Sequence, residues 1–542
     1  MAAREENLRI DKDKALTWMV GVTVFLLECA AGYYYNVFVG YYHEDGISRV
    51  ANAFYVLYSR NPHLGAIGFV WNPLPSFVDL FFLALYPWIP AMATKGIAGL
   101  LMCAIFAAAT ASFVAHAFVK RGLPRWSAVA FPLLFSLNPM IFLFGFNGMS
   151  DAPFMFFVIL TIVCFLNWLD TNKTGDLAIA SFALAFSFWC RYEAVPFGFS
   201  MILGSAIAVM LIQKHNHPSN EGGFHSKWSR AEGIFLVIAI PFFYSAALWI
   251  LANATIMNNP LYFLNGEYTN AAQIEGHLNN PLYASMLGNL ANTLIFASKK
   301  VLIFSAPLLS VLILRLLNRR IFRWDTLILF GMFASIPMLQ ILMLFKGMSL
   351  GWLRYFIYVL PVSFAWLPYE LSKIRRKWHI VIPLIAMAAN FAILSYAVTQ
   401  PSIAPDENTF LQNSFGHHTQ TYYDLKNYTG IARYLDENYP RSTILTDSFS
   451  AYFIILQSKF PKRFYISSDY EFKQAVSDPI KHGVDYILIP KPGSSSVISV
   501  INNAYPDLYD HGAGWAEPIK NFGSSWKLYK VIGSTGGSAV GK

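Results

Sequence analysis

Long uninterrupted apolar runs constrain the fold of this chain more than any other feature. Segments such as IAGLLMCAIFAAATASFVAHAF (97–118) and GIFLVIAIPFFYSAALWILANATI (233–256) are long enough to cross about 30 Å of hydrocarbon as helices. Of the 542 residues, 55% are hydrophobic and 13% are charged, and the hydrophobic residues are concentrated in such runs. This pattern is not that of a soluble globular protein. It predicts a polytopic α-helical membrane protein.

Basic residues decide how these runs cross the membrane. Spans are predicted at 15–38, 97–118, 126–146, 152–169, 177–190, 195–213, 233–257, 301–317, 325–345, 355–371 and 379–399. Clusters of basic residues lie at 4–14, 120–125, 214–230, 315–323 and 372–377. Positively charged loops collect on the cytoplasmic side of a membrane. All these clusters lie on the cytoplasmic side only if a further apolar stretch, 77–92, does not cross the membrane. The prediction is therefore about 11 transmembrane helices.

The stretch 77–92 is therefore expected to lie as an interfacial or re-entrant helix within one large external segment, 39–96. In that segment ISRVANAFYVLYSR (47–60) has apolar residues at helical spacing, which is typical of a helix lying flat at the interface. The N-terminal segment has no small-residue cleavage site and predicts a retained first helix with a cytoplasmic N-terminus. The net charge of +9 is explained by topology and does not require a nucleic-acid partner.

The composition changes after the membrane part, 1–400. Short β-strands are predicted at STILTD (442–447), RFYISS (463–468) and VDYILIP (484–490). Strands that alternate with helices predict a C-terminal α/β domain with a largely parallel sheet over 401–530. The parity of the spans places this domain on the extracytoplasmic side. The low-complexity tail, 531–542, is predicted to be disordered or a cloning remnant.

Three carboxylates fall at the outer ends of predicted spans. Glu44 and Asp45 follow the first span, and Asp151 lies in FGFNGMSDAPF (144–154). Asp151 has no basic neighbour in the sequence, and an unpaired carboxylate at such a depth is costly. Asp151 is therefore expected to face a polar cavity or a partner.

Basic side chains are predicted at the same membrane face. They are Arg191, which precedes Glu193, together with Lys299, Lys300 and Arg354. A carboxylate can take a proton from a hydroxyl or an amine, and Arg and Lys can hold a phosphate. Their coincidence at one face indicates an active site that deprotonates a neutral acceptor and handles an anionic, lipid-borne leaving group.

Each of these groups also has a purely structural explanation. Arg191 and Glu193 could cap a helix and pair with each other. Lys299 and Lys300 could be anchors that reach from a helix end to the interface.

Glu44 and Asp45 could likewise be helix N-terminal acids favoured by the helix dipole. His43 and the histidines at 63, 417 and 418 show no ligand spacing, and the cysteines match no metal motif. No metal site is assigned. A divalent cation held by Glu44, Asp45 and Asp151 stays open as an alternative, but the sequence does not require it.

Six short motifs, in their order and membrane side, resemble the membrane-embedded GT-C glycosyltransferases. Within that superfamily the resemblance is to the branch of the protein O-mannosyltransferases and the aminoarabinose transferase of lipid A. The motifs are HEDGISRVANAFY (43–55), WNPLPSF (71–77), GMSDAPF (148–154), RYEAV (191–195), NPLYF (259–263) and RYFIYVLP (354–361). The resemblance covers about residues 10–400.

This resemblance implies a GT-C fold, a polyprenyl-phosphate sugar donor, and transfer on the outer face with inversion. The first-loop acid of the family, taken as the catalytic base or its close helper, maps to Asp45, with Glu44 as the adjacent candidate. The second-loop acid maps to Asp151. The family order is Asp before Glu, whereas here Glu44 precedes Asp45, so the identity of the base stays open. Arg49 corresponds to a basic residue often found shortly after the acid.

The chain is accordingly predicted to be a hexosyl- or pentosyltransferase of a prokaryotic plasma membrane, with a lipid, glycan or protein acceptor and no required cofactor. The catalytic residues are expected to be Asp45, Glu44 and Asp151. The residues expected to bind the donor phosphate are Arg191, Arg354, Arg49, Lys299 and Lys300. Those expected to orient the acceptor or the sugar are Glu193, Tyr355 and His43.

Two other functions are weighed against this one. A transporter or flippase of a lipid-linked glycan would show polar or broken helices near the bilayer centre and an internal repeat, and the sequence shows neither. A non-catalytic assembly subunit would use its external domain to bind a partner. Such a subunit would tolerate the loss of Asp45 and Asp151, whereas the enzyme would not.

Overall fold

The computed structural model of this chain describes residues 2–212, 224–269, 272, 281–493 and 498–533. The chain forms two compact units. Unit 1 comprises Met1–Tyr34, Leu100–Ala252 and Pro281–Leu411, and unit 2 comprises Tyr35–Gly99, Asn253–Asn280 and Gln412–Lys542. Each unit thus combines segments that are distant in the sequence, and the predicted domain boundaries at 400 and 530 stay predictions. The predicted tail and the basic cluster at 214–230 lie largely outside the described residues.

The membrane part is helical, as predicted. The described helices that are long and apolar enough to span are Asp11–Val39, Ile97–Lys120, Asp151–Thr171, Ala194–Leu211, Trp228–Ile256, Trp324–Phe345 and Lys377–Thr399. A further span is available if α15 (Leu290–Ile303) and α16 (Ala306–Leu317), which meet at a bend of 77°, count as one. The described residues therefore confirm a polytopic α-helical membrane protein, and the number of 11 spans stays a prediction.

Prolines divide two of the predicted spans into shorter helices. The stretch 126–146 forms α6 (Arg125–Ser136) and α7 (Pro139–Phe144). The stretch 355–371 forms the end of η6 (Leu353–Phe356), then α18 (Val359–Ala365) and α19 (Leu367–Leu371). Pro139 and Pro368 lie in the first turns of α7 and α19, where a missing N–H is tolerated. A helix can restart at such a proline but cannot run through it undisturbed.

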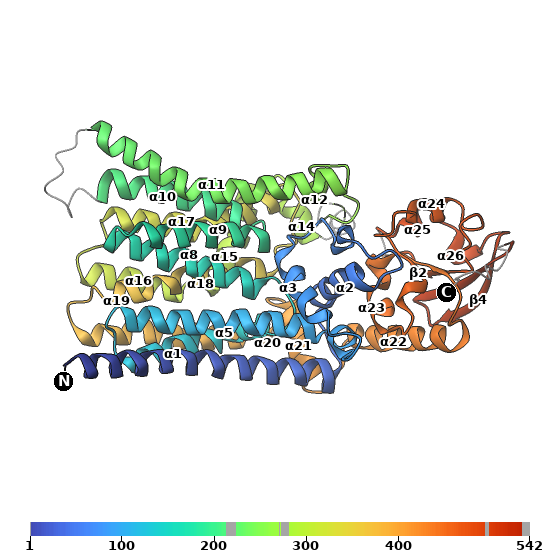
Figure 1. Cartoon of the computed structure of the whole chain (residues 1–542), viewed down its shortest axis with the longest axis horizontal. Helices are drawn as coiled ribbons and strands as arrows, with labels where there is room; N and C mark the ends of the chain where they lie inside the picture. Colours follow the sequence, from blue (N-terminus) through green and yellow to red (C-terminus); the bar gives the residue numbers. More distant parts are fainter. Residues whose placement is uncertain (1, 213–223, 270–271, 273–280, 494–497, 534–542) are drawn as a thin grey trace. The chain divides into compact units, whose positions relative to one another are not determined.

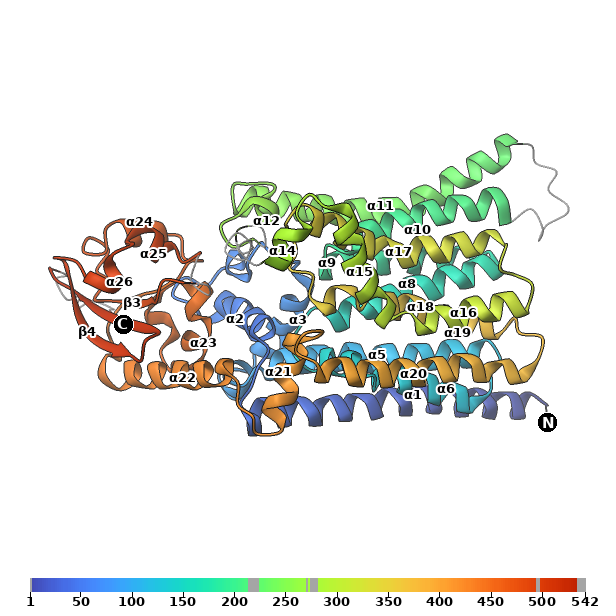
Figure 2. The ribbon, with the colours of Figure 1, turned by 180° about the vertical axis from the view of Figure 1, so that it is seen from behind.

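The helices of unit 1 pack along one another (Figures 1 and 2). The packed pairs are α8 (Asp151–Thr171) with α9 (Thr174–Cys190), α10 (Ala194–Ile207) with α17 (Trp324–Phe345), α16 with α20 (Val381–Thr399), and α1 (Ala2–Tyr33) with α6. The predicted span at 177–190 is α9, a helix of 17 residues. The helices α5 (Ile97–Lys120) and α11 (Phe224–Ile256) complete this set.

Three of the predicted cytoplasmic clusters meet through ion pairs at one end of unit 1. Arg125 Nε lies 2.7 Å from Asp13 Oδ1, which joins the clusters at 4–14 and 120–125. Arg121 and Lys373 both pair with Asp170, at 2.8 Å each. The clusters therefore share one end, as topology predicts, and which side of the membrane that end faces stays a prediction.

The cluster at 315–323 contributes a closed ionic network at the same end. Arg315 is completely buried and lies 3.0 Å from Asp325 Oδ1, and its Nε donates to Glu370 Oε1 at 3.0 Å. Arg320 pairs with the remaining oxygens, Asp325 Oδ2 and Glu370 Oε2, at 3.1 Å each. Two guanidinium groups and two carboxylates thus compensate one another, with the Trp366 ring below Arg315.

The segment 39–96, which is predicted to be external, belongs to unit 2. After η1 (Tyr34–Val39), its helices are α2 (Glu44–Tyr58), η2 (Leu64–Ile67), α3 (Leu74–Leu83) and α4 (Ala91–Thr94). The stretch 77–92 contains most of α3, whose ten residues give a length of about 15 Å. That is half of what a span needs, which agrees with the prediction that this stretch does not cross. The predicted surface helix at 47–60 corresponds to α2, which begins at Glu44 and ends at Tyr58.

The C-terminal part of unit 2 contains a five-stranded sheet of order β2-β1-β3-β5-β4. Its strands are β1 (Ile444–Leu445), β2 (Phe464–Tyr465), β3 (Tyr486–Pro490), β4 (Ala516–Phe522) and β5 (Trp526–Val531). All three predicted strands are present, and β1 pairs with β2 and β3 in parallel. The expectation of a largely parallel sheet is wrong, because the β4–β5 hairpin adds two antiparallel pairings.

Helices cover this sheet and complete the α/β arrangement. They include α22 (Gln420–Asn438), α23 (Ser448–Gln457), α24 (Phe472–Ser477), α25 (Val500–Ala504) and α26 (Leu508–His511), with η8 (Pro461–Arg463). Ile487, Leu488 and Ile489 of β3 are completely buried, as in a central strand covered on both faces. The other short described helices are α12 (Tyr262–Asn265), α14 (Pro281–Met286), α21 (Pro405–Ser414), η3 (Ala208–Ile212) and η7 (Lys377–Ile380).

Candidate functional site

Asp151 is the first residue of α8, and its side chain is completely buried. The Tyr358 hydroxyl donates a hydrogen bond to Asp151 Oδ1. Arg191 Nη1 lies 3.4 Å from Asp151 Oδ2 and donates to Ser150 Oγ at 3.2 Å. Asp151 therefore has polar partners, which offset the free-energy cost of burying a carboxylate in an apolar environment.

Arg191 follows α9 directly, and Glu193 precedes α10. The Arg191 guanidinium donates two hydrogen bonds to the Glu193 carboxylate, from Nη2 to Oε1 at 2.7 Å and from Nε to Oε2 at 3.2 Å. Burial lowers the pKa of Arg191, but the charges of Glu193, Tyr358 and Asp151 outweigh it and the pKa is raised. The structural alternative for this pair is therefore realised, and the Arg191 cation already faces two carboxylates.

The Asp151 cluster consists of Asp151, Arg191, Glu193 and Tyr358. It holds two carboxylates and one guanidinium, so its charge is unfavourable for a further anion such as a phosphate. Its hydrogen bonds instead fix the Tyr358 ring beside Arg191, whose Cζ lies 5.4 Å from the ring centroid. The arrangement is suited to holding polar groups in place rather than to binding a phosphate.

One helical turn before Tyr358, Arg354 forms part of a second cluster. The Arg354 side chain is 3% exposed, and its Cζ lies 4.2 Å from the Trp352 ring and 5.4 Å from the half-buried Tyr355 ring. Such cation–π contacts hold the guanidinium in one position. Tyr355 thus lies beside a basic residue of the predicted donor site.

Glu407 of α21 completes this second cluster, which we call the Lys300–Arg354 cluster. Burial and the neighbouring Asp406 raise the pKa of Glu407 to about 7, although its own backbone N–H and the charges of Arg354 and Lys300 lower it. Lys300 and Arg354 therefore act on the same carboxylate. Burial lowers the pKa of Lys300, although the charges of Glu407 and Asp406 in turn raise it, so two carboxylates act on this pair of cations.

The two adjacent lysines have different surroundings. Lys300 is partly buried, with Nζ 5.0 Å from the Phe296 ring centroid, whereas Lys299 is exposed. The segment before Arg354 packs closely on this part of α15. A Cβ at Gly351 would lie 2.6 Å from Phe296 Cε1, and Gly351 has a φ of +59°, so both space and backbone conformation require glycine.

Glu44 and Asp45 form the first turn of α2 in unit 2, with His43 as the N-cap residue. Glu44 is exposed, and Asp45 is half-buried. Burial raises the pKa of the Tyr452 hydroxyl on α23, and the charges of Glu44 and Asp45 raise it further. The charges of the two acids thus act on the half-buried Tyr452, and their place at the helix N-terminus also agrees with the dipole explanation.

Arg49 lies one turn further along α2 and is buried, with 5% exposure. Its Cζ is 4.4 Å from the Trp71 ring centroid in the WNPLPSF motif. The carboxylate of Asp79 on α3 is completely buried. Burial raises the pKa of Asp79 to about 8, although the charge of Arg49 lowers it. Arg49 therefore joins α2 to the motif at 71–77 within unit 2.

The predicted site residues thus form three groups. Asp151, Arg191 and Glu193 come together, as do Lys300, Arg354 and Tyr355, all in unit 1. Glu44, Asp45, Arg49 and His43 belong to unit 2. Sequence reasoning missed Tyr358, Glu407 and Asp79. Tyr358 lies within the motif RYFIYVLP, and Asp79 lies two residues after WNPLPSF, whereas the acidic run that contains Glu407 gives no signal for its partners.

No group of three or more His, Cys, Asp or Glu residues is placed to hold a metal ion among the described residues. A divalent cation at Glu44, Asp45 or Asp151 therefore stays an untested alternative.

Comparison with known proteins places this geometry in context. Residues 81–245 match the family model described as dolichyl-phosphate-mannose-protein mannosyltransferase. Among solved structures, the chain is similar to ArnT from Cupriavidus metallidurans bound to undecaprenyl phosphate, with a TM-score of 0.49 and 11% identity over 96% of this chain and 99% of that chain. No protein of curated description matches the sequence. The family match includes Asp151, Arg191 and Glu193, supports a glycosyltransferase embedded in a membrane, and confirms the resemblance to the GT-C glycosyltransferases that the motifs predict.

Proposed function

We propose that this chain transfers a sugar from a polyprenyl-phosphate-linked donor to an acceptor at the outer face of the membrane, with inversion at the anomeric carbon. The observation that carries the proposal is the family match over residues 81–245, whose description names a dolichyl-phosphate sugar donor. Dolichyl phosphate is a polyprenyl phosphate. The second support is a pair of cations in unit 1, Lys300 and Arg354, whose charges both lower the pKa of Glu407.

Lys300 and Arg354 are proposed to hold the donor phosphate. Arg191 is a weaker choice than the sequence suggests, because Glu193 and Asp151 already compensate its charge. Negative charge develops on the phosphate as the sugar leaves, and fixed cations stabilise that charge without reorganising. Arg354 fits this role because Trp352 and Tyr355 hold its guanidinium in place. Lys299, which is exposed, is better explained as an anchor at the helix end.

Asp45, with Glu44 beside it, is proposed to act as general base. The acceptor oxygen or nitrogen forms a bond to the anomeric carbon and gives its proton to the carboxylate. The bond between the anomeric carbon and the phosphate oxygen breaks, and polyprenyl phosphate leaves with the electron pair. A single displacement of this kind inverts the anomeric carbon. The step balances without a metal or a redox cofactor.

Asp151 is proposed to act as a positioning residue. Its side chain has no exposed surface, so it works through the groups that it touches, the Tyr358 hydroxyl and the Arg191 guanidinium. Those groups would orient the sugar or the acceptor. Loss of Asp151 is therefore expected to change the apparent affinity as well as the rate.

The test measures transfer from radiolabelled dolichyl- and undecaprenyl-phosphate hexoses and pentoses to a membrane acceptor fraction. Purified wild type is compared with Asp45→Asn, Glu44→Gln and the matched control Asp176→Asn. Asp176 is also a half-buried acid in the first turn of a helix, α9. A general base contributes about 10²–10⁴-fold to a rate.

We expect wild type and Asp176→Asn to transfer equally and Asp45→Asn to lose at least 100-fold. A larger loss in Glu44→Gln than in Asp45→Asn would identify Glu44 as the base. Equal transfer by all four folded proteins would refute a base in this loop. No transfer by wild type from any donor would refute the proposed reaction.

A further inference from the structure

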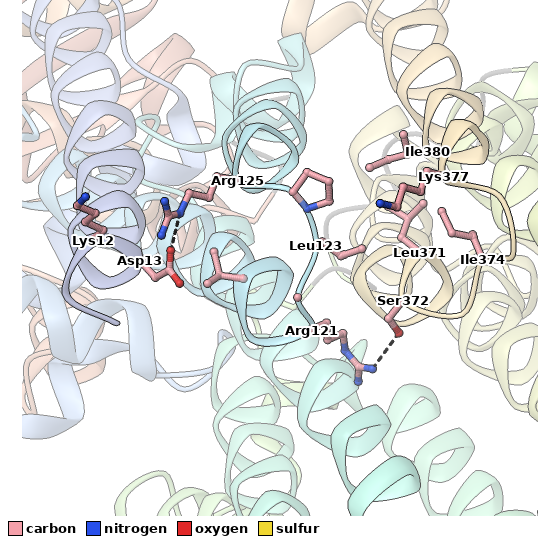
Figure 3. Close-up of a pocket in the computed structure, with 13 residues that line it drawn as sticks. Lys12, Asp13, Arg121, Leu123, Arg125, Leu371, Ser372, Ile374, Lys377 and Ile380 are labelled. Carbon is pink, nitrogen blue, oxygen red and sulfur yellow. Dashed lines mark hydrogen bonds and ion pairs between the residues drawn. The ribbon is translucent and has the colours of Figure 1, made fainter. Parts of the chain in front are cut away.

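A cavity of about 810 Å³ opens at the end of unit 1 where the predicted cytoplasmic clusters meet. Its lining comes from the start of α1, from the α5–α6 connection, and from the segment between α19 and α20 (Figure 3). Its size falls within the range of specific ligand sites. It contains none of the residues assigned to sugar transfer above.

The cavity is strongly cationic. Lys12, Arg121, Arg125 and Lys377 line it, and Asp13 is the one carboxylate among its lining residues. Arg125 pairs with Asp13 at 2.7 Å, and Arg121 pairs with Asp170 at 2.8 Å. Among the described side chains, Lys12 and Lys377 form no ion pair.

Apolar side chains also line the cavity, beside the cations. Figure 3 shows Arg125 and Asp13 in contact on one side, and Lys377 with Leu371, Ile374 and Ile380 on the other. Leu123 lies between the two sides. A small soluble anion would need only the cations for binding. A ligand with a charged head and an apolar body would use both the cations and the apolar side chains.

The lining residues also stand at the ends of three candidate spans. Lys12 is the second residue of the span Asp11–Val39, Arg121 directly follows Ile97–Lys120, and Lys377 begins Lys377–Thr399. Span ends lie where hydrocarbon gives way to lipid headgroups. The cations are therefore at the level of the phosphates in the adjoining lipid leaflet.

We propose that this cavity binds the phosphate headgroup of an anionic phospholipid. Lys377 would contact the phosphate, and Lys12, on the opposite side of the cavity (Figure 3), would attract it through its charge. Leu123, Ile374 and Ile380 would contact the glycerol and the first acyl carbons. Basic pockets between membrane helices are known to recognise anionic lipid headgroups. Topology alone explains why positive charges gather on one side of the membrane. It does not explain why apolar side chains line the same cavity.

The test is lipid binding to the delipidated full-length protein in detergent, measured by native mass spectrometry. The probes are dioleoylphosphatidylglycerol, dioleoylphosphatidylcholine and inorganic phosphate. The test variant is Lys12→Ala/Lys377→Ala, and the matched control is Lys14→Ala/Arg376→Ala. The control residues are exposed and lie one or two positions away in the same segments, but they do not line the cavity.

We expect wild type to bind phosphatidylglycerol at least tenfold more tightly than phosphatidylcholine. Each lysine removed from the cavity should weaken phosphatidylglycerol binding about fivefold, and the control should bind like wild type. An equal loss in both double variants would show a general effect of surface charge and overturn the site. Equal affinity for both lipids, or equally tight binding of inorganic phosphate, would overturn the assignment to an anionic lipid. Because no turnover is measured, failure here leaves the proposed sugar transfer untouched.

Discussion

Replacement of Arg315 by methionine is predicted to destabilise unit 1 strongly, although Arg315 belongs to no proposed site. Arg315 is completely buried and touches both carboxylates of the network, Asp325 at 3.0 Å and Glu370 at 3.0 Å. Methionine fills much of the same volume but supplies no charge. The variant would leave two buried carboxylates with Arg320 as the remaining guanidinium of the closed network.

The magnitude follows from the imbalance of charge. Removing one partner of a buried ion pair costs about 3–5 kcal/mol, because the other partner stays buried without compensation. A loss of 4 kcal/mol lowers the folding equilibrium constant by about 10³. Removing Glu370 as well, in Arg315→Met/Glu370→Leu, leaves Arg320 and Asp325 as a balanced pair at 3.1 Å. That double variant should be more stable than Arg315→Met by about 2 kcal/mol or more, since apolar replacement of a whole buried pair is often close to neutral.

The assay is the free energy of unfolding in mixed micelles, followed by tryptophan fluorescence as SDS is added. Arg323→Met serves as the control, because Arg323 is 53% exposed and lies 3.7 Å from Asp325. An exposed pair of this kind contributes no more than about 1 kcal/mol. If Arg315→Met cost no more than Arg323→Met, the network would not be buried. Glu370→Leu is measured alone as well. If Arg315→Met/Glu370→Leu lost as much stability as Arg315→Met and Glu370→Leu together, the reasoning from charge balance would be refuted.

Three further predictions follow from other parts of unit 1. Gly145→Ala should cost about 1–3 kcal/mol by overpacking, because the added Cβ would overlap the buried Glu28 carboxylate. In Gly145→Ala/Glu28→Ala the clash should be relieved, so the two substitutions should be coupled in a double-mutant cycle of unfolding free energies. Additive losses would contradict this. Glu407 has a folded-state pKa of about 7 against an ordinary value of 4.5, so it binds its proton more tightly when folded. Its contribution to stability is therefore present below about pH 4.5 and is lost as the pH rises to about 7. Between pH 5 and pH 8, the melting temperature of Glu407→Gln should fall less than that of wild type. An equal fall in both proteins would exclude Glu407 as the cause of the pH dependence. Gly351→Ala combines a φ of +59° with a Cβ 2.6 Å from Phe296, whereas Gly122→Ala has a φ of +69° and open space around the Cβ. Unfolding measurements should therefore show a larger loss for Gly351→Ala, about 1 kcal/mol beyond the backbone strain that both share, and equal losses would show that Phe296 moves away without cost.

Local sequence patterns predicted the elements of this protein well. Apolar runs of sufficient length identified the membrane helices, because burial in hydrocarbon requires about 20 consecutive apolar residues. Buried apolar runs likewise identified β1, β2 and β3. The strand β4 was missed because five successive residues of its seven are exposed, which leaves no apolar alternation. The hairpin partner β5 was missed with it, and the predicted sheet was therefore parallel.

The candidate site was only partly predictable. The sequence indicated Asp151, Arg191, Glu193 and Arg354 from charge at span ends. It could not show that Arg191 is held by two carboxylates, since Asp151 is 40 residues away. It also could not show that Glu407 joins Lys300 and Arg354. The ion pairs that support the structural explanation of Arg191 therefore came from the structure, and phosphate binding by Lys300 stays a proposal.

The sequence by itself determined that this chain is a helical membrane protein with an α/β portion after it, and that its acids and bases gather at span ends. Hydrophobic length and periodicity are local properties, so the order of residues is enough to state them. Only the tertiary structure decided which charges compensate each other. Tyr358 and Asp151 are 207 residues apart in the chain. Contacts of that kind exist only after the helices have packed, because packing brings distant side chains into a low-dielectric interior where each charge must find a partner.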